Sequence, residues 1–242
     1  MIRSNYSDES LTLMAYLAEN AHAHANTTYV VYIETGWEAH NWLTKVEQGE
    51  VFAQRLGFTP IRLKSKASFA QLVEDRKRFP SKKFQWCAGF LKGLPLLEWL
   101  DLKDPDLQWI IALPKRQAMY RAPIVESITE CPYHGERTVL HPIRTLTNSQ
   151  KDTLLQKYGL IPTYQRSKEC DPCVHSSAQD LLNMTQSDID KTIQLERVID
   201  ATMYTSGLDK LIREIAMQHK SARQYTMDSF SMGCGDPFGC GL

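Results

Sequence analysis

Helix-like and strand-like segments alternate along the chain up to Leu113, and this alternation constrains the fold more than any other feature. Residues 27–36 are rich in β-branched and aromatic side chains and end at a glycine, which is typical of a buried strand. Residues 107–113 are almost wholly apolar and precede a proline, as a central parallel strand does. Strands that alternate with amphipathic stretches indicate βαβ units, so we expect a three-layer α/β/α fold with a mostly parallel sheet.

The other elements follow from the same periodicity. Short strands are expected at 1–4 and 58–65. Helices are expected to begin near Asp8, to contain Trp42 to Leu56, and to cover 67–79, 93–102, 147–159, 185–204 and 208–220. The proline-rich stretch 121–146 predicts a long connection that is functional or mobile. The tail 231–242 is too rich in glycine to be helical.

Charge and composition exclude several classes of protein. The 28 Lys and Arg residues equal the 28 Asp and Glu residues, which argues against a binder drawn by charge to nucleic acid or membranes. No apolar run approaches the roughly 20 residues of a membrane span, and no leader is evident, so we expect a cytoplasmic protein without a membrane partner. The six cysteines are expected to be reduced thiols, metal ligands or redox groups rather than a disulfide framework.

The first helix begins in a segment crowded with hydroxyl and carboxyl groups. The loop between a parallel strand and the next helix lies at the ligand crevice of an α/β sheet, where a helix amino terminus suits phosphate. Ser7 and Ser10 can donate hydroxyl hydrogen bonds there, and Asp8 or Glu9 can hold Mg²⁺. The alternative is ordinary capping of the helix by Ser7 or Asp8.

The next strand ends in Glu34, Thr35 and Gly36, at the same edge of the predicted sheet. Together with residues 5–10, it resembles the phosphoadenylylsulfate (PAPS) reductase-like branch of the PP-loop ATP pyrophosphatases. That family has a serine-glycine-glycine-lysine-aspartate-serine loop, and its next strand ends in aspartate-threonine-glycine.

Two later segments extend the resemblance over nearly the whole chain. The family's tryptophan-cysteine, leucine-lysine and proline positions fall on Trp86, Cys87, Leu91, Lys92 and Pro95. Residues 141–146 and 158–173 resemble the family's last βα segment and its pair of cysteines two residues apart.

The resemblance implies the fold of the adenine nucleotide alpha hydrolases. It implies an α/β nucleotide-binding domain over 1–165, with a helical, cysteine-containing extension over 166–242 packed against it as one unit. It implies binding of ATP and Mg²⁺ by residues of the loop, the second strand end and two basic positions, namely Asn5, Tyr6, Ser7, Asp8, Glu9, Ser10, Glu34, Thr35, Gly36, Trp37, Lys92 and Arg121. It assigns catalysis to the loop side chains and the paired thiols, namely Ser7, Asp8, Ser10, Cys170 and Cys173.

The loop departs from the family pattern at three positions. Tyr6 and Ser7 replace its two glycines, and Asp8 replaces its lysine. Glycine permits the positive φ that lets a backbone close on phosphate, so the loop is expected to take another shape or to bind more weakly. Arg121 is the best match to the family's arginine segment after the fourth strand.

The spacing of Cys170 and Cys173 suits two ligands of one metal or iron–sulfur cluster, or a redox pair. The resemblance adds Cys87 as a further ligand of a [4Fe–4S] cluster or zinc. The possible fourth ligands are Cys131, Cys234 and Cys240. Thiols that relay sulfur and plain buried cysteines are the alternatives.

The function implied by the resemblance is ATP pyrophosphatase chemistry, in which an acceptor is adenylylated for sulfur transfer. We expect the acceptor to be DNA, bound through a complex with other modification subunits, in Dnd- or Ssp-type phosphorothioate modification for phage defence. A cysteine desulfurase would supply the sulfur. A sulfonucleotide (PAPS or adenylylsulfate) reductase is the second interpretation, although the tail 231–242 lacks that family's cysteine motif. A PP-loop subunit that has lost catalysis and assembles a complex or senses nucleotide is the third.

Overall fold

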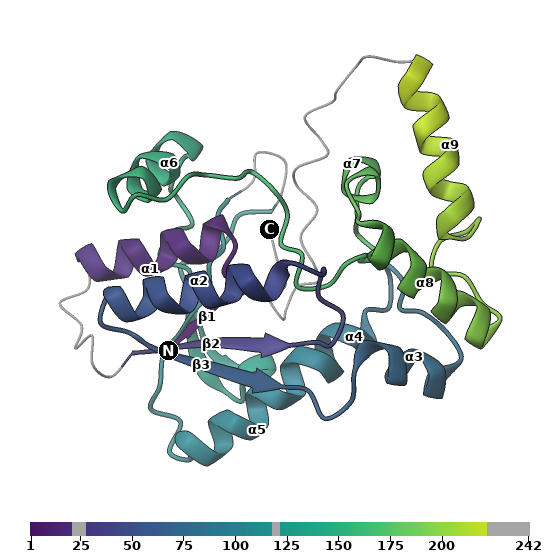
Figure 1. Cartoon of the computed structure of the whole chain (residues 1–242). Coiled ribbons are helices and arrows are strands. Elements are labelled where there is room, and N and C mark those ends of the chain that lie inside the picture. The colour runs from purple at the N-terminus through teal and green to yellow at the C-terminus, as the bar shows by residue number, and fades with distance from the viewer. Residues whose placement is uncertain (21–27, 118–121, 222–242) are drawn as a thin grey trace.

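The computed structural model describes residues 1–20, 28–117 and 122–221, and within them one six-stranded sheet organises the chain (Figure 1). The strands lie in the order β3-β2-β1-β4-β6-β5. Their bounds are β1 Ile2–Arg3, β2 Tyr29–Glu34, β3 Thr59–Lys64, β4 Ile111–Ala112, β5 Ser127–Cys131 and β6 Arg137–Leu140. All neighbouring strands are parallel except β5, which runs antiparallel to β6 at the edge.

Helices cover both faces of the sheet, which confirms the three-layer α/β/α prediction (Figure 1). On one face lie α1 (Asp8–Asn20), α2 (Trp42–Arg55) and α6 (Asn148–Lys157), and on the other lies α5 (Leu94–Lys103). Strand β2 is apolar because it faces both layers. Val30 and Tyr32 pack in the core beneath the first layer, whereas Val31 packs in the core beneath α5.

A π-helical segment interrupts the helix on the second face. Helix α4 (Trp86–Ala88) continues into the π-helical segment Gly89–Gly93, which continues into α5. A π-helical turn inside an α-helix is rare and frequently lies at a functional site. The segment includes Lys92, whose side chain is buried.

Three C-terminal helices lie beside the sheet, namely α7 (Ala178–Leu182), α8 (Gln186–Ile199) and α9 (Leu208–Ser221) (Figure 1). Helix α8 shares an apolar cluster with segments from the first half of the chain. Trp37, Trp86 and Phe69 of α3 (Phe69–Arg76) pack in one apolar cluster with Cys173 and Leu195. The segments before and after residue 165 are therefore joined by a common core.

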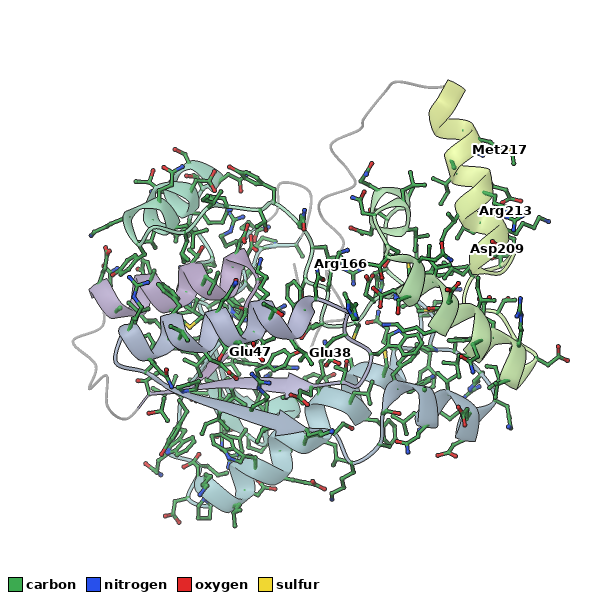
Figure 2. All side chains as sticks on the ribbon, in the orientation of Figure 1. Glu38, Glu47, Arg166, Asp209, Arg213 and Met217 are labelled. Atoms are coloured by element: carbon green, nitrogen blue, oxygen red, sulfur yellow. The ribbon has the colours of Figure 1, made fainter. Side chains whose placement is uncertain are left out.

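The outer side of α9 carries two charged side chains and an exposed methionine. Asp209, Arg213 and Met217 follow one side of the helix in Figure 2, and an exposed ion pair joins the first two, with Arg213 Nη2 2.8 Å from Asp209 Oδ2. No helix among the described residues is long and apolar enough to cross a membrane.

The sequence prediction for 121–146 was wrong, because this stretch contains β5, a 3₁₀ turn at Pro132–His134 and β6. Both strands are short, and β5 is exposed along most of its length, so neither shows a long apolar pattern. A buried ion pair holds β6 to the end of α5, with Arg137 Nε 2.7 Å from Asp104 Oδ2. The strand predicted at 107–113 is also shorter, since Asp104 accepts hydrogen bonds from the amides of residues 108 and 109 and holds them outside the sheet.

The other predicted helices are present, and α7 is an addition that the sequence did not predict. Thr185 caps α8 by accepting a hydrogen bond from the amide of Asp188, as its capping pattern predicts. The tail 231–242 lies outside the described residues.

Candidate nucleotide site at the ends of the first two strands

The sheet order places a crevice at the carboxyl end of β1. The chain runs from β1 outward to β3 and then returns to β4 on the other side of β1. Loops that follow β1 and β4 therefore diverge, and open α/β sheets bind ligands at such a switch point. The predicted loop 5–10 follows β1 directly, so the fold places it at this crevice.

Side chains of the loop hold its own backbone in place. The amide of Asn5 donates to Ser10 Oγ at 3.2 Å, and the amide of Tyr6 donates to Ser4 Oγ at 3.0 Å. The amide of Ser7 donates to Asn5 Oδ1 at 3.0 Å, which also accepts from Ser10 Oγ at 2.8 Å. Three loop amides thus have partners within the loop, and its shape is set without a ligand.

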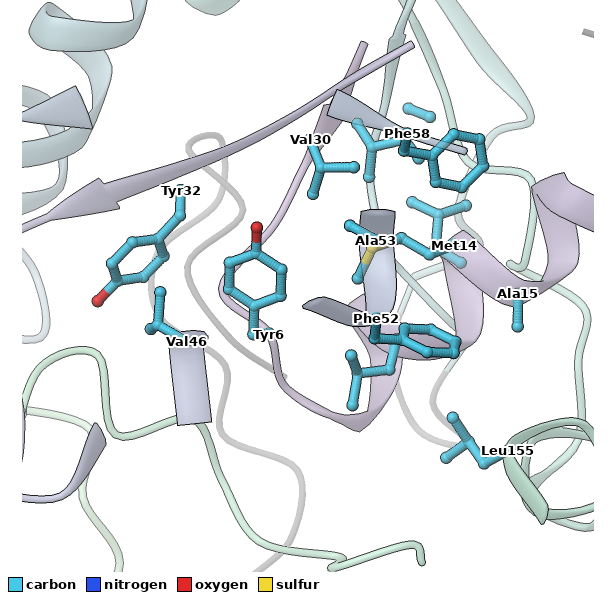
Figure 3. Close-up of a cluster of buried hydrophobic side chains, with 14 of the residues drawn as sticks. Tyr6, Met14, Ala15, Val30, Tyr32, Val46, Phe52, Ala53, Phe58 and Leu155 are labelled. Atoms are coloured by element: carbon cyan, nitrogen blue, oxygen red, sulfur yellow. The ribbon is translucent and has the colours of Figure 1, made fainter. Parts of the chain in front are cut away.

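Tyr6 has the backbone conformation that the family's glycine would supply. Its φ is 57°, in the left-handed region, and its ring is fully buried. Figure 3 shows the ring in the core beside Tyr32, Val46 and Phe52. A Cβ placed on Gly49 of α2 would lie 2.2 Å from Tyr6 Cδ1, so a glycine is needed opposite the ring. The ring therefore lies in the core and not in the crevice.

Two acidic side chains at the start of α1 tie the loop to distant segments. Asp8 accepts hydrogen bonds from the amides of Thr163 and Tyr164 at 2.7 and 3.0 Å, and Lys45 Nζ lies 3.7 Å from its Oδ1. Glu9 pairs with Arg116, which follows β4, at 2.9 Å. Both carboxylates are engaged within the protein.

The carboxyl end of β2 is the docking point for residues 168–172. Thr35 Oγ1 donates to the carbonyl of Glu169 at 2.8 Å, and the amide of Asp171 donates to the carbonyl of Trp37 at 2.8 Å. Trp37 Nε1 donates to the carbonyl of Pro172 at 3.1 Å. Gly36 has a positive φ of 68°, and a Cβ there would lie 2.9 Å from Ser68 Cβ. The Cys170–Cys173 segment therefore lies beside the predicted nucleotide residues.

A buried ion pair joins this segment to the π-helical segment. Lys92 Nζ lies 2.8 Å from Glu169 Oε1, and the side chains are only 3% and 8% exposed. Asn5 Nδ2 donates to the same oxygen at 3.4 Å. The Glu169 carboxylate thus faces two of the side chains that the resemblance assigns to nucleotide binding. Glu34 lies apart from this group, because its carboxylate faces Arg62 at 3.4 Å.

Glu169 was missed by the sequence analysis. Its partner Lys92 lies far away in the chain, and only its position directly before Cys170 distinguishes it. The contacts of Asp8 with Thr163 and Tyr164 were missed for the same reason.

Three of the predicted cysteines lie in one region. Cys87 and Cys170 pack against the apolar cluster that contains Cys173, and none of the three forms a disulfide. Burial raises the pKa of the Cys170 thiol, and the nearby Lys92 ammonium opposes that shift. Cys170 Sγ lies 3.8 Å from Thr35 Oγ1.

Cys131 does not join this group. It pairs with Arg137 at the amino end of β6, and its Sγ lies 3.4 Å from His134 Nδ1. Among the described residues, no group of three or more His, Cys, Asp and Glu side chains is arranged to hold a metal. Arg121, Cys234 and Cys240 lie outside the described residues, and the metal or cluster stays a prediction.

Comparison with known proteins gives a likeness of fold alone. No family model matches the sequence, and no curated protein matches it. Solved structures with a similar fold include the following two. PAPS reductase from Candida auris, a phosphate complex, aligns with a TM-score of 0.48 and 9% identity over 65% of this chain and 71% of its own. NMN synthetase from Francisella tularensis aligns with a TM-score of 0.48 and 9% identity over 93% of this chain and 87% of its own. At this identity we transfer no functional residue from either protein.

Proposed function

We propose that the chain is an ATP pyrophosphatase that binds the phosphates of ATP at the loop 5–10 and adenylylates an acceptor for sulfur transfer. The conformation of Tyr6 carries this proposal. A non-glycine residue in the left-handed region costs about 1–3 kcal/mol and persists where the surroundings require it, frequently at functional sites. The buried ring lets Tyr6 keep a glycine-like backbone at a strand-to-helix turn.

The Lys92–Glu169 pair supports an anion site beside this loop. Two charges buried together are stabilised only while they remain paired, because desolvation of each costs several kcal/mol. A phosphate that displaces the Glu169 carboxylate would take over the ion pair with Lys92 and the hydrogen bond from Asn5. The Glu169 carboxylate then competes with nucleotide phosphate for Lys92. Hydration of the released carboxylate offsets part of the free energy needed to break the ion pair.

Adenylyl transfer from ATP depends more on stabilising the charge of the leaving group than on a covalent intermediate with the protein. ATP supplies the α-phosphorus, which an acceptor oxygen attacks while the bond to the β-phosphate oxygen breaks and pyrophosphate leaves. Lys92 and the amino terminus of α1 would stabilise the charge on the leaving pyrophosphate. Asp8 and Glu9 do not fit a magnesium site as they stand, because Thr163, Tyr164 and Arg116 engage their carboxylates. We therefore derive no step through Mg²⁺.

The thiols beside the site support sulfur transfer as the purpose of adenylylation. Cys170 lies against Thr35 at the end of β2, with Cys87 and Cys173 in the same cluster. We propose that the acceptor is DNA, held with partner subunits, and that a cysteine desulfurase loads sulfur for phosphorothioate modification. A balanced formal charge fits DNA contact that is shared with partners.

AMP and pyrophosphate release tests the proposal. The full chain is incubated with ATP and Mg²⁺, with and without a cysteine desulfurase and duplex DNA, and products are separated by ion-exchange chromatography. We expect both products in equal amounts, and we expect Lys92→Gln to lower their release at least 100-fold. Lys66→Gln is the matched control, because Lys66 is exposed and pairs with Glu98 away from the loop.

Loss of folding must be separated from loss of function. Lys92→Gln leaves Glu169 buried without its cation, so the double variant Lys92→Gln/Glu169→Gln, which removes both charges, is measured as well. A folded double variant that turns over ATP at the wild-type rate would exclude Lys92 from the site.

A subunit that binds nucleotide without turnover is the second candidate, favoured by the loop amides and Lys92 already having partners within the protein. ATP binding by calorimetry without AMP release would favour it over the enzyme. Absence of ATP binding would contradict both.

A further inference from the structure

The end of α3 and the loop that leads from it to α4 concentrate positive charge in one short stretch. Residues 76–84, the basic loop, contain no carboxylate and five cations, namely Arg76, Lys77, Arg78, Lys82 and Lys83. The chain as a whole is neutral, so this charge is a local feature. Four of the five side chains are exposed, and Arg76 is half-buried. Among the residues that the structure describes, none of the five forms an ion pair with a carboxylate.

A stack of planar groups holds the base of the basic loop. The guanidinium carbon of Arg76 lies 4.9 Å from the ring centroid of Trp86 and 4.5 Å from that of Phe90. Trp86 is buried and stacks on Phe69 at 6.0 Å between ring centroids. Residues 77–85 therefore leave the protein at Arg76 and return to the same place at Trp86, which gathers the cations on one loop.

The tip of the basic loop is a tight turn. The amide of Ser81 donates to the carbonyl of Phe84 at 3.1 Å, and the amide of Phe84 donates to the carbonyl of Ser81 at 3.2 Å. Lys82 and Lys83 lie between these two residues and are exposed at the turn. The guanidinium carbon of Arg78 lies 5.7 Å from the centroid of the Phe84 ring. The turn thus presents two lysines beside an aromatic ring.

Two aromatic side chains are exposed among these cations. Phe84 is 56% exposed and Phe90 is 46% exposed, and an arginine lies over each ring. Proteins that bind unpaired nucleic acid combine these two features, because bases stack on aromatic rings while cations contact the phosphates. Duplex DNA offers no base face to such a ring, since its bases are already stacked on one another.

The basic loop lies near the candidate nucleotide site. Helix α3 begins at the end of β2, where the amide of Phe69 donates to the carbonyl of Thr35 at 3.2 Å, and its eight residues span about 12 Å. Figure 1 shows α3 and α4 beyond the carboxyl ends of β2 and β3. Phe90 also belongs to the same π-helical segment as Lys92, with Phe90 exposed and Lys92 buried. A strand on the basic loop can therefore reach the crevice within a few nucleotides.

We propose that the basic loop binds an unpaired stretch of DNA, with its cations on the phosphates and with Phe84 and Phe90 stacked on the bases. The role of this strand as the acceptor rests on the proposed function, but its binding does not require ATP. A lipid surface fits less well, because a helix that binds membranes leaves its apolar face free, whereas Phe69 and Val73 of α3 are buried in the core.

Fluorescence anisotropy of a labelled 12-nucleotide oligo(dT) tests binding by the full chain without ATP. The logarithm of the association constant is expected to fall with the logarithm of the salt concentration by about 0.7 per phosphate contact. Lys82→Gln/Lys83→Gln should weaken binding at least tenfold at low salt and reduce this slope by about 1.4, because two contacts are lost. Lys157→Gln/Lys210→Gln is the matched control, because it removes two exposed lysines of α6 and α9.

An abasic strand of the same length separates stacking from charge. It carries the same phosphates without bases, so it is expected to bind at least tenfold more weakly than oligo(dT). Phe84→Ala should weaken the binding of oligo(dT) about 5- to 150-fold, while the salt slope and the binding of the abasic strand stay unchanged. Leu102→Ala is the matched control, because it truncates an exposed apolar side chain of α5. Thermal unfolding checks that every variant is folded.

Four results would overturn the proposal: equal weakening by a control variant, equal affinity for oligo(dT) and the abasic strand, equal affinity for oligo(dT) and its duplex with oligo(dA), or tighter binding to phosphatidylserine vesicles than to oligo(dT). The proposed function fails separately. A chain that binds oligo(dT) as expected but releases no AMP from ATP keeps the DNA-binding surface and loses the enzyme. A chain that releases AMP but does not bind oligo(dT) loses this inference alone.

Discussion

Tyr6 and Gly49 form a complementary pair in which each residue explains the other. The backbone of Tyr6 is held in the left-handed region, and its ring fills the space that a side chain at position 49 would occupy. Glycine inside a helix is destabilising by about 0.5–1 kcal/mol relative to alanine. Helix α2 nevertheless contains Gly49, because the Tyr6 ring occupies the space of a larger side chain there.

A double-mutant cycle should expose this coupling. Gly49→Ala is expected to lower the free energy of unfolding by about 1–3 kcal/mol in the wild type, because its Cβ overlaps the Tyr6 ring. In a Tyr6→Gly background the same change should instead stabilise the protein by up to about 1 kcal/mol. Urea unfolding of the four proteins measures the difference. Equal effects in both backgrounds would show that the ring and the glycine are independent.

At the scale of elements, the segment after α6 crosses the ends of β1 and β2 and carries charged groups into the interior. Burial raises the pKa of Asp171 to about 6, and Lys168 Nζ, 3.8 Å from its carboxylate, opposes the shift only in part. The folded state therefore holds a proton that the unfolded state, with a pKa near 3.9, releases. Asp171 stabilises the fold at about pH 4, and this contribution is lost as the pH rises through 6.

Asp171→Asn should weaken the dependence of the free energy of unfolding on pH. A difference of about two pKa units corresponds to about 3 kcal/mol, so the wild type should lose about that much more stability than the variant between pH 4 and pH 7. Chemical unfolding at a series of pH values measures it. The buried His134 titrates in both proteins, so its contribution cancels in the comparison. Parallel pH profiles would mean that Asp171 has an ordinary pKa.

The sequence predicted some elements well, for reasons visible in their packing. Strand β2 was identified because both of its faces are buried, and α1 because its apolar spacing is regular. Strands β5 and β6 were missed because they are short and owe their position to an edge pairing and to the Asp104–Arg137 pair. Such pairings join residues that are distant in the chain, and no local pattern encodes them.

The position of the candidate site could also be predicted from the sequence, but its internal contacts could not. The loop 5–10 and the end of β2 follow from the rule that strand ends gather at one edge. Neither the partner of Lys92 nor the conformation of Tyr6 could be read from the sequence, since one is a contact between distant segments and the other depends on Gly49. The prediction that Cys131 could join the other thiols failed because β5 runs antiparallel to its neighbour β6, which puts Cys131 at the amino end of β6.

At the scale of the whole molecule, the shared cluster of Trp37, Phe69 and Trp86 with α8 argues that the chain folds as one unit. A fragment of residues 1–165 would expose these aromatic rings and lose the hydrogen bonds from Thr35 and Trp37 to the C-terminal segment. We expect it to lack a cooperative unfolding transition and to aggregate.

The matched fragment ends at residue 206 and removes α9 together with residues 222–242; α9 packs in a separate cluster with α7 and α8. This fragment should remain soluble and unfold cooperatively at a lower temperature. Tryptophan fluorescence and calorimetry compare the two fragments. A 1–165 fragment with a sharp transition and native tryptophan emission would show an autonomous first domain.

The π-helical segment Gly89–Gly93 has an implication for the history of the chain. Each residue of an α-helix turns by about 100°, so deleting one residue here would leave an ordinary helix while swinging Lys92 away from Glu169. Leu96 and Leu100 would stay anchored beneath the sheet, and the architecture would survive. A single inserted residue in this segment is thus enough to turn Lys92 into the protein interior while the rest of the fold is kept. Ancestral or sister sequences lacking it should also lack the acidic residue that now neutralises that cation.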